Sequence, residues 1–251
     1  MNIIDFEDWC LRNSSDAIKN LDKQTICELT HKAYIDINYG NSNIIPIYHG
    51  TGNINFKLNP TLNNKHNDYG SGLYTTPDLD LAKEWALSVY NKSNSGIVIE
   101  YLLVKDGLKV LNLLNKDILY WIAILLVNRP VQVQDTRLDL FIEKFKVNIT
   151  SFDIIIGWRA DDSYYAYIRD FINGTISLET LSAAVKLGNL GKQICVRTEK
   201  AFSQLHELYR YNCGSEYSNK FLKRDRDARN EYAKMKKIYK PEETYIHDLL
   251  K

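Results

Sequence analysis

The sequence lacks a long apolar run and an excess of one charge. Its most apolar stretch, residues 118–127, is about half as long as the roughly 20 residues of a membrane-spanning helix. With 32 basic and 31 acidic residues the formal net charge is +1, so bulk charge predicts neither a nucleic-acid nor a membrane partner. The start is too short and polar for an export signal, and we expect a cytoplasmic protein.

Cysteine is also scarce. Cys10, Cys27, Cys195 and Cys213 are widely spaced, without a Cys-x-x-Cys pair, and we find no histidine beside them in ligand spacing. This pattern predicts reduced thiols and no metal site. The Gly-x-Gly-x-x-Gly sequence is missing too, which argues against a redox dinucleotide site of the doubly wound type.

The composition is that of an ordinary globular protein, with 45% hydrophobic and 25% charged residues among 251. We expect three parts: a helical extension over residues 1–43, a central domain over 44–212, and a basic helical segment over 213–251 that packs on this domain. The extension reads as two amphipathic helices. Packing beneath the core is its favoured role, with covering a cleft or binding a partner as alternatives.

Residues 44–76 are the most informative stretch, with two strand-like runs around a polar loop. The first ends in His49, Gly50 and Thr51, and the second places Gly72 ahead of Tyr74. Gly50 lets the backbone approach a planar amide, while His49 and Thr51 offer neutral hydrogen-bonding groups to a ribose. Tyr74 offers a stacking face worth roughly 0.5–1.5 kcal/mol beyond area burial. Nicotinamide with its ribose meets these demands, although a strand end and a half-buried tyrosine explain each residue singly.

In its motifs the sequence resembles ADP-ribosyltransferases of the diphtheria-toxin and poly(ADP-ribose) polymerase type, and more narrowly a bacterial domain-of-unknown-function family of that clan. The resemblance covers most of the chain from about residue 44 onward. It is carried by Tyr48-His49-Gly50-Thr51, Asp68-Tyr69-Gly70-Ser71-Gly72-Leu73-Tyr74-Thr75-Thr76, Leu79-x-x-Ala82-x-x-Trp85-Ala86, Gly157-Trp158-Arg159-Ala160-Asp161-Asp162, Phe171-x-x-Gly174-x-Ile176-Ser177 and Gln193-x-x-x-x-Thr198-x-x-Ala201.

The resemblance implies an α+β fold, an ADP-ribosyltransferase-like split antiparallel β-sheet core with surrounding helices. It implies cleavage of the nicotinamide N-glycosidic bond of NAD+ and transfer of ADP-ribose to a macromolecular acceptor, either protein or nucleic acid. NAD+ would be a consumed substrate, bound by His49, Gly50, Thr51, Gly72 and Tyr74, without a metal. A role as a bacterial toxin would add an antitoxin partner; phage defence or self-modification are the other roles considered.

The clan has a His-Tyr-Glu catalytic signature, and this chain departs from it at the third position. His49 and Tyr74 match, but Gln193 stands where the glutamate is expected. Glutamine keeps the hydrogen bond to the ribose and lacks the charge. Because a preorganised electrostatic group contributes roughly 2.7–4 kcal/mol in the transition state, we expect dinucleotide binding with slower chemistry or a changed acceptor.

Three more residues are candidates on weaker signals. Arg129 precedes Pro130 at a helix end, where it can reach a pyrophosphate or cap helix carbonyls. Arg159 and Asp161 follow a buried strand, where they can orient the acceptor or form an ion pair with each other. Two alternative functions stay open: a module that binds NAD+ or ADP-ribose without transfer, and an enzyme similar to RNA 2′-phosphotransferases, which share the His-Gly-Thr strand.

Overall fold

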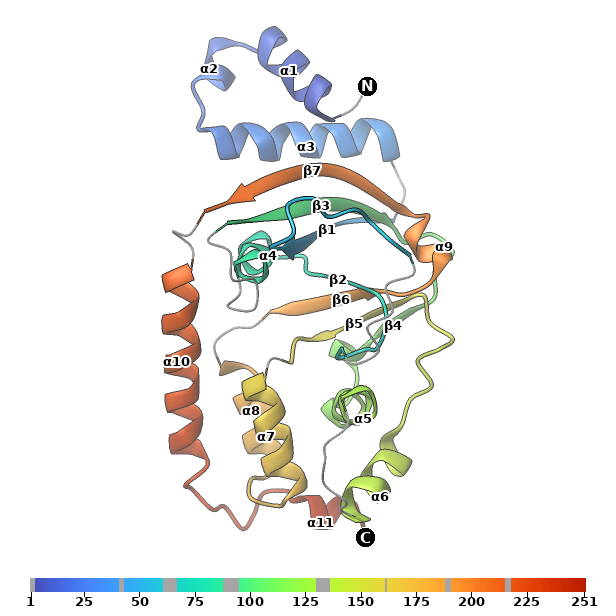
Figure 1. The fold of residues 1–251 in the computed structure, drawn as a ribbon, viewed down its shortest axis with the longest axis vertical. Coiled ribbons are helices and arrows are strands. Elements are labelled where there is room, and N and C mark those ends of the chain that lie inside the picture. Colours follow the sequence, from blue (N-terminus) through green and yellow to red (C-terminus); the bar gives the residue numbers. More distant parts are fainter. Residues whose placement is uncertain are drawn as a thin grey trace.

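The computed structural model describes residues 3–40, 43–60, 67–87, 95–129, 136–160, 162–187, 191–214 and 218–251. In this part of the chain a three-stranded and a four-stranded sheet stack on each other, with helices on the outer face of each (Figure 1). The predicted α+β class is confirmed. None of the described helices is long and apolar enough to cross a membrane.

The first sheet is antiparallel and has the order β1 (Ile44–Thr51), β3 (Gly96–Val104), β7 (Leu205–Cys213). The central strand β3 is buried along almost its whole length, since both faces of the sheet are covered. Its run of Ile, Val and Leu matches this environment, because β-branched and large aliphatic side chains suit a fully buried strand.

The second sheet has the order β2 (Leu73–Thr75), β6 (Lys192–Val196), β5 (Ile154–Trp158), β4 (Val110–Asn112). Its neighbours are antiparallel except β4 and β5, which run parallel. Two helices, α5 (Ile118–Asn128) and α6 (Thr136–Phe145), lie between these parallel strands along the chain, as a crossover connection requires.

The two sheets meet where β1 approaches β2. The Tyr48 N–H donates to the Thr76 carbonyl at 2.7 Å, and the Thr76 N–H donates to the Tyr48 carbonyl at 2.9 Å. Beside this bridge the facing sides of the sheets share an apolar core that includes Ile47, Ile99 and Ile194. The bridge therefore joins the edges of two otherwise separate sheets.

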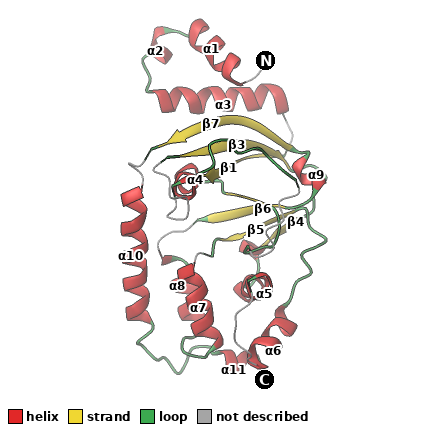
Figure 2. Ribbon diagram, in the orientation of Figure 1, coloured by secondary structure: helices red, strands yellow, loops and turns green. Residues whose placement is uncertain are grey.

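Helix α3 (Lys23–Tyr39) lies over the outer face of the first sheet with α1 (Ile3–Asn13) packed beside it, and the short α2 (Asp16–Lys19) joins them farther from the sheet (Figure 2). Phe6 of α1 packs there with Leu102 of β3 and Leu208 of β7. The Asp22 carboxylate caps α3 by accepting from the Thr25 N–H at 3.0 Å. The extension thus packs on the core, as the sequence favours, although the predicted helix pair is separated by the additional short helix α2.

A buried polar contact ties α3 to the first sheet. His31 Nδ1 lies 3.2 Å from the carboxylate of Glu100, which also accepts from the Tyr211 hydroxyl at 2.5 Å. Burial lowers the pKa of His31, but hydrogen bonds with Cys27 and Glu100 outweigh burial and raise the pKa to about 10. Fully buried charge is stable only when it is paired in this way.

A helical layer covers the outer face of the second sheet, with α5, α6, α7 (Asp162–Ile172) and α8 (Leu178–Ala184) (Figure 1). Trp121 is fully buried within it. Its indole N–H donates to the Tyr69 hydroxyl and the Trp158 carbonyl, both at 3.1 Å. The shorter helix η2 (Leu113–Asn115) leads from β4 into α5, and α9 (Glu199–Phe202) connects β6 to β7.

The basic helix α10 (Ser218–Met235) packs on this layer, followed by α11 (Ile246–Leu249) (Figure 1). The ring of Tyr232 lies 3.6 Å from that of Tyr167, and its hydroxyl donates to Asp170 at 2.6 Å. Lys236 pairs with the same carboxylate at 2.7 Å. Some of the basic side chains of this segment therefore hold it on the domain.

Candidate functional site

His49 connects the two sheets beside the Tyr48–Thr76 bridge. Its Nδ1 lies 2.8 Å from the Tyr74 carbonyl oxygen. Because a carbonyl only accepts, Nδ1 carries the hydrogen, and Nε2 of the neutral ring remains an acceptor. Burial lowers the pKa of His49, against the effect of its bond to Tyr74. The site therefore contains a neutral imidazole of defined tautomer.

The residues after His49 form a turn around its ring. The Phe56 ring lies 4.6 Å from the imidazole, centroid to centroid. The Thr51 hydroxyl accepts from the Asn53 N–H at 3.2 Å, which closes the turn. Thr51 keeps its hydroxyl hydrogen as a donor. The turn thus holds the histidine ring against an apolar neighbour.

The peptide groups of Gly50 lie on the edge of β1 that faces the second sheet. The N–H and C=O of Tyr48 point across this edge to Thr76. Backbone groups alternate between the two edges of a strand, so those of Gly50, two residues further, point the same way. Beyond the Tyr48–Thr76 bridge, β1 and β2 form no further pairing within the described residues. The N–H and C=O of Gly50 can therefore pair with a planar amide.

Gly50 also has a packing role that the sequence interpretation missed. A Cβ at this position would lie 1.8 Å from the Ala82 carbonyl oxygen of α4 (Leu79–Ala86). Gly96, on the neighbouring strand, meets Ala86 in the same way, with 2.4 Å to its carbonyl oxygen. The glycine is therefore required for α4 to approach the sheet, in addition to any contact with a ligand.

Tyr74 lies on β2 with its hydroxyl engaged by the preceding loop. The hydroxyl accepts from the Tyr69 N–H at 2.8 Å and donates to the Gly70 carbonyl at 2.6 Å. Burial raises the pKa of Tyr74 well above its usual value. The ring lies parallel to that of Tyr69, 6.3 Å away. Its fixed, neutral hydroxyl makes Tyr74 suited to ring stacking rather than proton transfer.

Gly72 allows β2 to lie close to β6. A Cβ there would lie 2.6 Å from both the Cys195 sulfur and the Val196 carbonyl oxygen. Its φ of +155° also disfavours other residues. Strand packing thus requires a glycine here, and the NAD+ contact that the resemblance implies for Gly72 stays a prediction.

Gln193 lies on the same face of the second sheet as Tyr74. Tyr74 pairs with Cys195, and Gln193, two residues before Cys195, has the same facing. Gln193 is 4% exposed. Its amide has no hydrogen-bond partner among the described residues, but it keeps contact with solvent. A nearly buried amide with access to solvent is available to a ligand.

Arg129 joins three loops instead of standing open at the helix end. Its Nη1 donates to Asp68 Oδ1 at 3.1 Å and to the Ala160 carbonyl at 3.0 Å, and the Ala160 N–H donates to Asp68 Oδ2 at 3.0 Å. Burial raises the pKa of Asp68 despite these contacts. The Arg129 backbone N–H caps its own helix by donating to the Leu125 carbonyl at 2.8 Å, and its side chain fixes the loop before β2 to the loop after β5.

Arg159 forms an ion pair that the sequence did not predict. Its Nη1 lies 2.9 Å from Glu84 of α4, and Arg224 of α10 lies 2.5 Å from the other oxygen of this carboxylate. The Arg159 guanidinium also lies over the Trp85 ring at 5.7 Å. Asp161, the expected partner, lies outside the described residues. Glu84 is thus the acid that holds α10 and the loop after β5 together.

Residues 45–207 match the family described as "Protein of unknown function (DUF3990)". The chain belongs to this family. No curated protein and no solved structure matches it. The DUF3990 region includes β1 through the start of β7, and with them His49, Tyr74 and Gln193; helices α1–α3 and α10 lie outside it.

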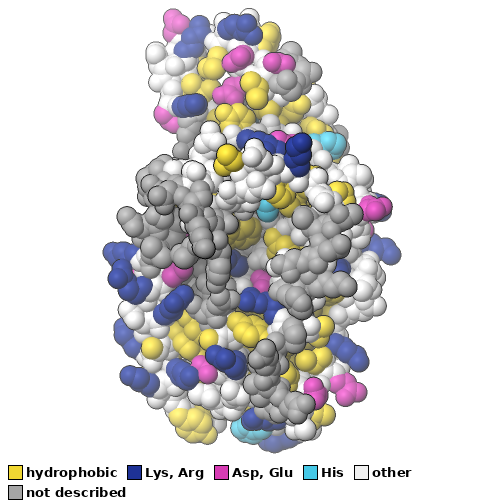
Figure 3. Space-filling model, viewed as in Figure 1, with side chains coloured by type: hydrophobic (Ala, Val, Ile, Leu, Met, Phe, Trp, Pro, Cys, Tyr) yellow, Lys and Arg dark blue, Asp and Glu magenta, His cyan; other side chains and the backbone are white. Residues whose placement is uncertain are grey.

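The candidate site of the DUF3990 region combines a neutral acceptor, a backbone edge, an aromatic ring and a neutral amide. One face of the molecule has a hollow near its middle, where hydrophobic, acidic and basic side chains and a histidine reach the surface (Figure 3).

Sequence reasoning missed Asp68, Glu84 and Arg224. Asp68 directly precedes the Tyr69-Gly70 motif, and Glu84 is an acid within the buried face of α4; both positions were signals that could have been used.

Proposed function

We propose that this protein is an NAD+-dependent ADP-ribosyltransferase whose nicotinamide site lies where β1 and β2 separate. The observation that carries the proposal is the 2.8 Å hydrogen bond from His49 to the Tyr74 carbonyl. It joins two residues of the His-Tyr-Glu pattern across the junction of two sheets. The split, mostly antiparallel arrangement of these sheets supports an ADP-ribosyltransferase-like core.

The nicotinamide ring would lie against Tyr74 with its amide on the edge of β1. The N–H and C=O of Gly50 form a donor–acceptor pair that complements a carboxamide. The neutral His49 accepts at Nε2 and suits a ribose hydroxyl. Thr51 adds a hydroxyl on the same strand, and Gly72 supports the site by letting β2 lie close to β6. These groups recognise nicotinamide riboside without any charge of their own.

In this proposal, Gln193 determines how fast the nicotinamide N-glycosidic bond of NAD+ breaks. Positive charge develops at the anomeric carbon as nicotinamide departs, and a carboxylate would stabilise it. The Gln193 amide accepts a hydrogen bond from a ribose hydroxyl and supplies no compensating charge. We therefore infer slow cleavage, followed by transfer of ADP-ribose to a protein or nucleic-acid acceptor.

Arg129 and Arg159 mainly position a loop that borders the proposed site. Arg129 is held by Asp68 and Ala160, and Arg159 by Glu84. Since both contacts involve the loop after β5, we assign the arginines to positioning this loop around the dinucleotide. An acceptor-orienting role for Arg159 would require its ion pair with Glu84 to open.

Nicotinamide release and label transfer test the proposal. Wild type, Gln193→Ala and Gln193→Glu are incubated with NAD+ labelled on the adenine, with cell protein or RNA added separately. We expect slow release by wild type, less by Gln193→Ala and more by Gln193→Glu, because the carboxylate restores the missing charge. Equal turnover per folded molecule in all three would remove Gln193 from the reacting centre.

The same experiment distinguishes the alternative functions. NAD+ binding without any release, even in Gln193→Glu, would indicate a module that binds the dinucleotide only. A further incubation with 2′-phosphorylated RNA and NAD+ tests the phosphotransferase alternative. Loss of the RNA phosphate in that sample would replace the proposal.

A further inference from the structure

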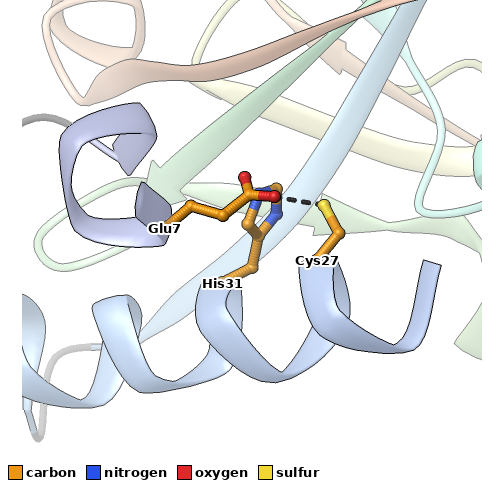
Figure 4. Close-up of side chains that lie close together, drawn as sticks. All are labelled: Glu7, Cys27 and His31. Atoms are coloured by element: carbon orange, nitrogen blue, oxygen red, sulfur yellow. Dashed lines mark hydrogen bonds between the residues drawn. The ribbon is translucent and has the colours of Figure 1, made fainter. Parts of the chain in front are cut away.

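A cluster of metal-ligand side chains lies between the N-terminal helices and the first sheet, outside the DUF3990 region. Glu7 comes from α1, and Cys27 and His31 come from α3 (Figure 4). One potential ligand atom from each lies within 4.8 Å of the others. Cys27 Sγ is 3.3 Å from His31 Nε2. Three different donor types therefore converge from two helices.

We propose that Glu7, Cys27 and His31 bind a divalent transition-metal ion, with Zn²⁺ as the best match. Sulfur, imidazole nitrogen and carboxylate oxygen are the donors that zinc takes in proteins. Tetrahedral zinc with ordinary bond lengths separates a sulfur from a nitrogen ligand by about 3.6 Å. The observed 3.3 Å is close to this value, so Cys27 and His31 need only a small adjustment.

The helix geometry brings the two α3 ligands to one face. Cys27 and His31 are four residues apart on α3, and side chains at this spacing lie one above the other. The sequence interpretation, which found no histidine in ligand spacing beside a cysteine, was wrong here. The half-buried Glu7 makes no hydrogen bond or ion pair within the described part of the chain. Its carboxylate can therefore turn toward the ion.

The contacts of the His31 ring match those of a histidine that binds a metal ion. Metal-binding histidines usually donate their other ring N–H to a carboxylate or carbonyl, which fixes the tautomer and orientation. His31 Nδ1 contacts Glu100 at 3.2 Å, and Glu100 is itself fixed by the Tyr211 hydroxyl. Nε2 thus faces Cys27 and Glu7. This second observation distinguishes the cluster from a chance meeting of three polar side chains.

The bound ion would fasten the helical extension to the sheet. It would link α1 to α3 directly and, through Glu100, to β3. Helices as short as α1 and α2 are marginal alone, and α1 otherwise contacts α3 through apolar packing such as Phe6 against Tyr34, 5.6 Å between ring centroids. The described residues provide three ligands, and a water molecule can complete a tetrahedral site.

Cobalt(II) titration of the full chain tests the site. Protein stripped of metal with a chelator is titrated with Co²⁺ and followed by the thiolate-to-cobalt and ligand-field absorption, and Zn²⁺ then displaces the cobalt. We expect saturation at one equivalent with the intensity of a tetrahedral thiolate site. Cys27→Ser should lose the thiolate band, and Glu100→Gln should weaken binding by about 10–100-fold.

Cys10→Ser is the matched control, because Cys10 lies on α1 and makes no part of the cluster. It should bind cobalt as wild type does, and Glu7→Gln should bind it more weakly while keeping the thiolate band. Circular dichroism verifies that each variant is folded. The absence of saturable binding in wild type, or an unchanged thiolate band in folded Cys27→Ser, would overturn the proposal.

Discussion

His49 and His31 lie on opposite faces of the first sheet and differ in the partner of one ring nitrogen. Nδ1 of His49 contacts a backbone carbonyl, and the pKa of this histidine is lowered, chiefly by burial. Nδ1 of His31 contacts the Glu100 carboxylate, and its pKa rises to about 10 despite burial. One fold thus contains a neutral imidazole that suits a ribose and a histidine whose surroundings attract a cation.

The difference teaches that the partner, and not the residue type, sets what a buried histidine can do. A carbonyl dipole fixes the tautomer without adding charge, whereas a carboxylate favours a proton or a metal ion at the ring. Changing the partners should therefore alter the two histidines in different ways.

The largest effect is expected from Glu100→Ala. The side chains of Glu100 and His31 are 3% and 8% exposed, and removal of one partner of a buried pair costs about 3–5 kcal/mol. Urea unfolding of metal-free protein measures the free energy of unfolding. Glu207→Ala, which breaks a partly exposed pair with Arg210, is the control and should change this energy by at most about 1 kcal/mol. Equal effects of the two variants would contradict the buried-pair account.

Gly50→Ala tests the His49 side of the comparison. The added Cβ would lie 1.8 Å from the Ala82 carbonyl oxygen, so β1 and α4 must separate, at a cost of about 1–3 kcal/mol. Because His49 is the preceding residue, NAD+ affinity should fall as well. Thermal unfolding and NAD+ titration of one preparation measure both effects. A variant as stable as wild type would show that α4 does not pack as closely as described.

The pH dependence of stability should have opposite signs for the two histidines. For His31 in metal-free protein, the raised pKa predicts a stabilising contribution that is complete below about pH 6.5 and is lost as the pH rises through the folded-state value of about 10. Cys27, Tyr209 and Glu7 also lie beside this ring, and Tyr211 bonds its partner Glu100. The difference in unfolding free energy between wild type and His31→Gln therefore isolates its effect, and a difference that does not change from pH 6.5 to 10 would refute it.

For His49 the lowered pKa predicts the reverse sign. Below about pH 6.5 the unfolded chain takes up a proton at this residue more readily than the folded chain, so stability falls as the pH falls. His49→Gln should reduce the slope of unfolding free energy against pH between 5 and 6.5. Histidine NMR signals provide an independent check, because the His49 resonance should titrate below the ordinary histidine pKa of about 6.5.

Local patterns in the sequence predicted the elements that depend on short-range physics. The two strand-like runs within residues 44–76, the amphipathic helices of the N-terminal extension and the buried strand before Arg159 follow from apolar periodicity. They agree with β1, β2, α1, α3 and β5 of the structure.

Contacts between distant residues were not predictable in this way. Glu84 lies 75 positions from its partner Arg159 and 140 positions from its partner Arg224. No periodicity in the sequence indicates which basic residue an acid will contact. The close approach of α4 to Gly50 and the convergence of Glu7 with Cys27 and His31 likewise depend on how helices dock on the first sheet. Of these docked contacts, only the approach of α4 to Gly50 touches the proposed nicotinamide site.

Isothermal titration with NAD+ tests the central claim most directly, that the β1–β2 junction is a nicotinamide site. Wild type, His49→Ala and Tyr74→Ala are compared with His247→Ala, an exposed histidine of α11 outside the DUF3990 region. We predict saturable binding by wild type and His247→Ala, and affinity reduced at least about tenfold, or 1.4 kcal/mol, in both folded site variants. Unchanged affinity in His49→Ala and Tyr74→Ala would contradict the account.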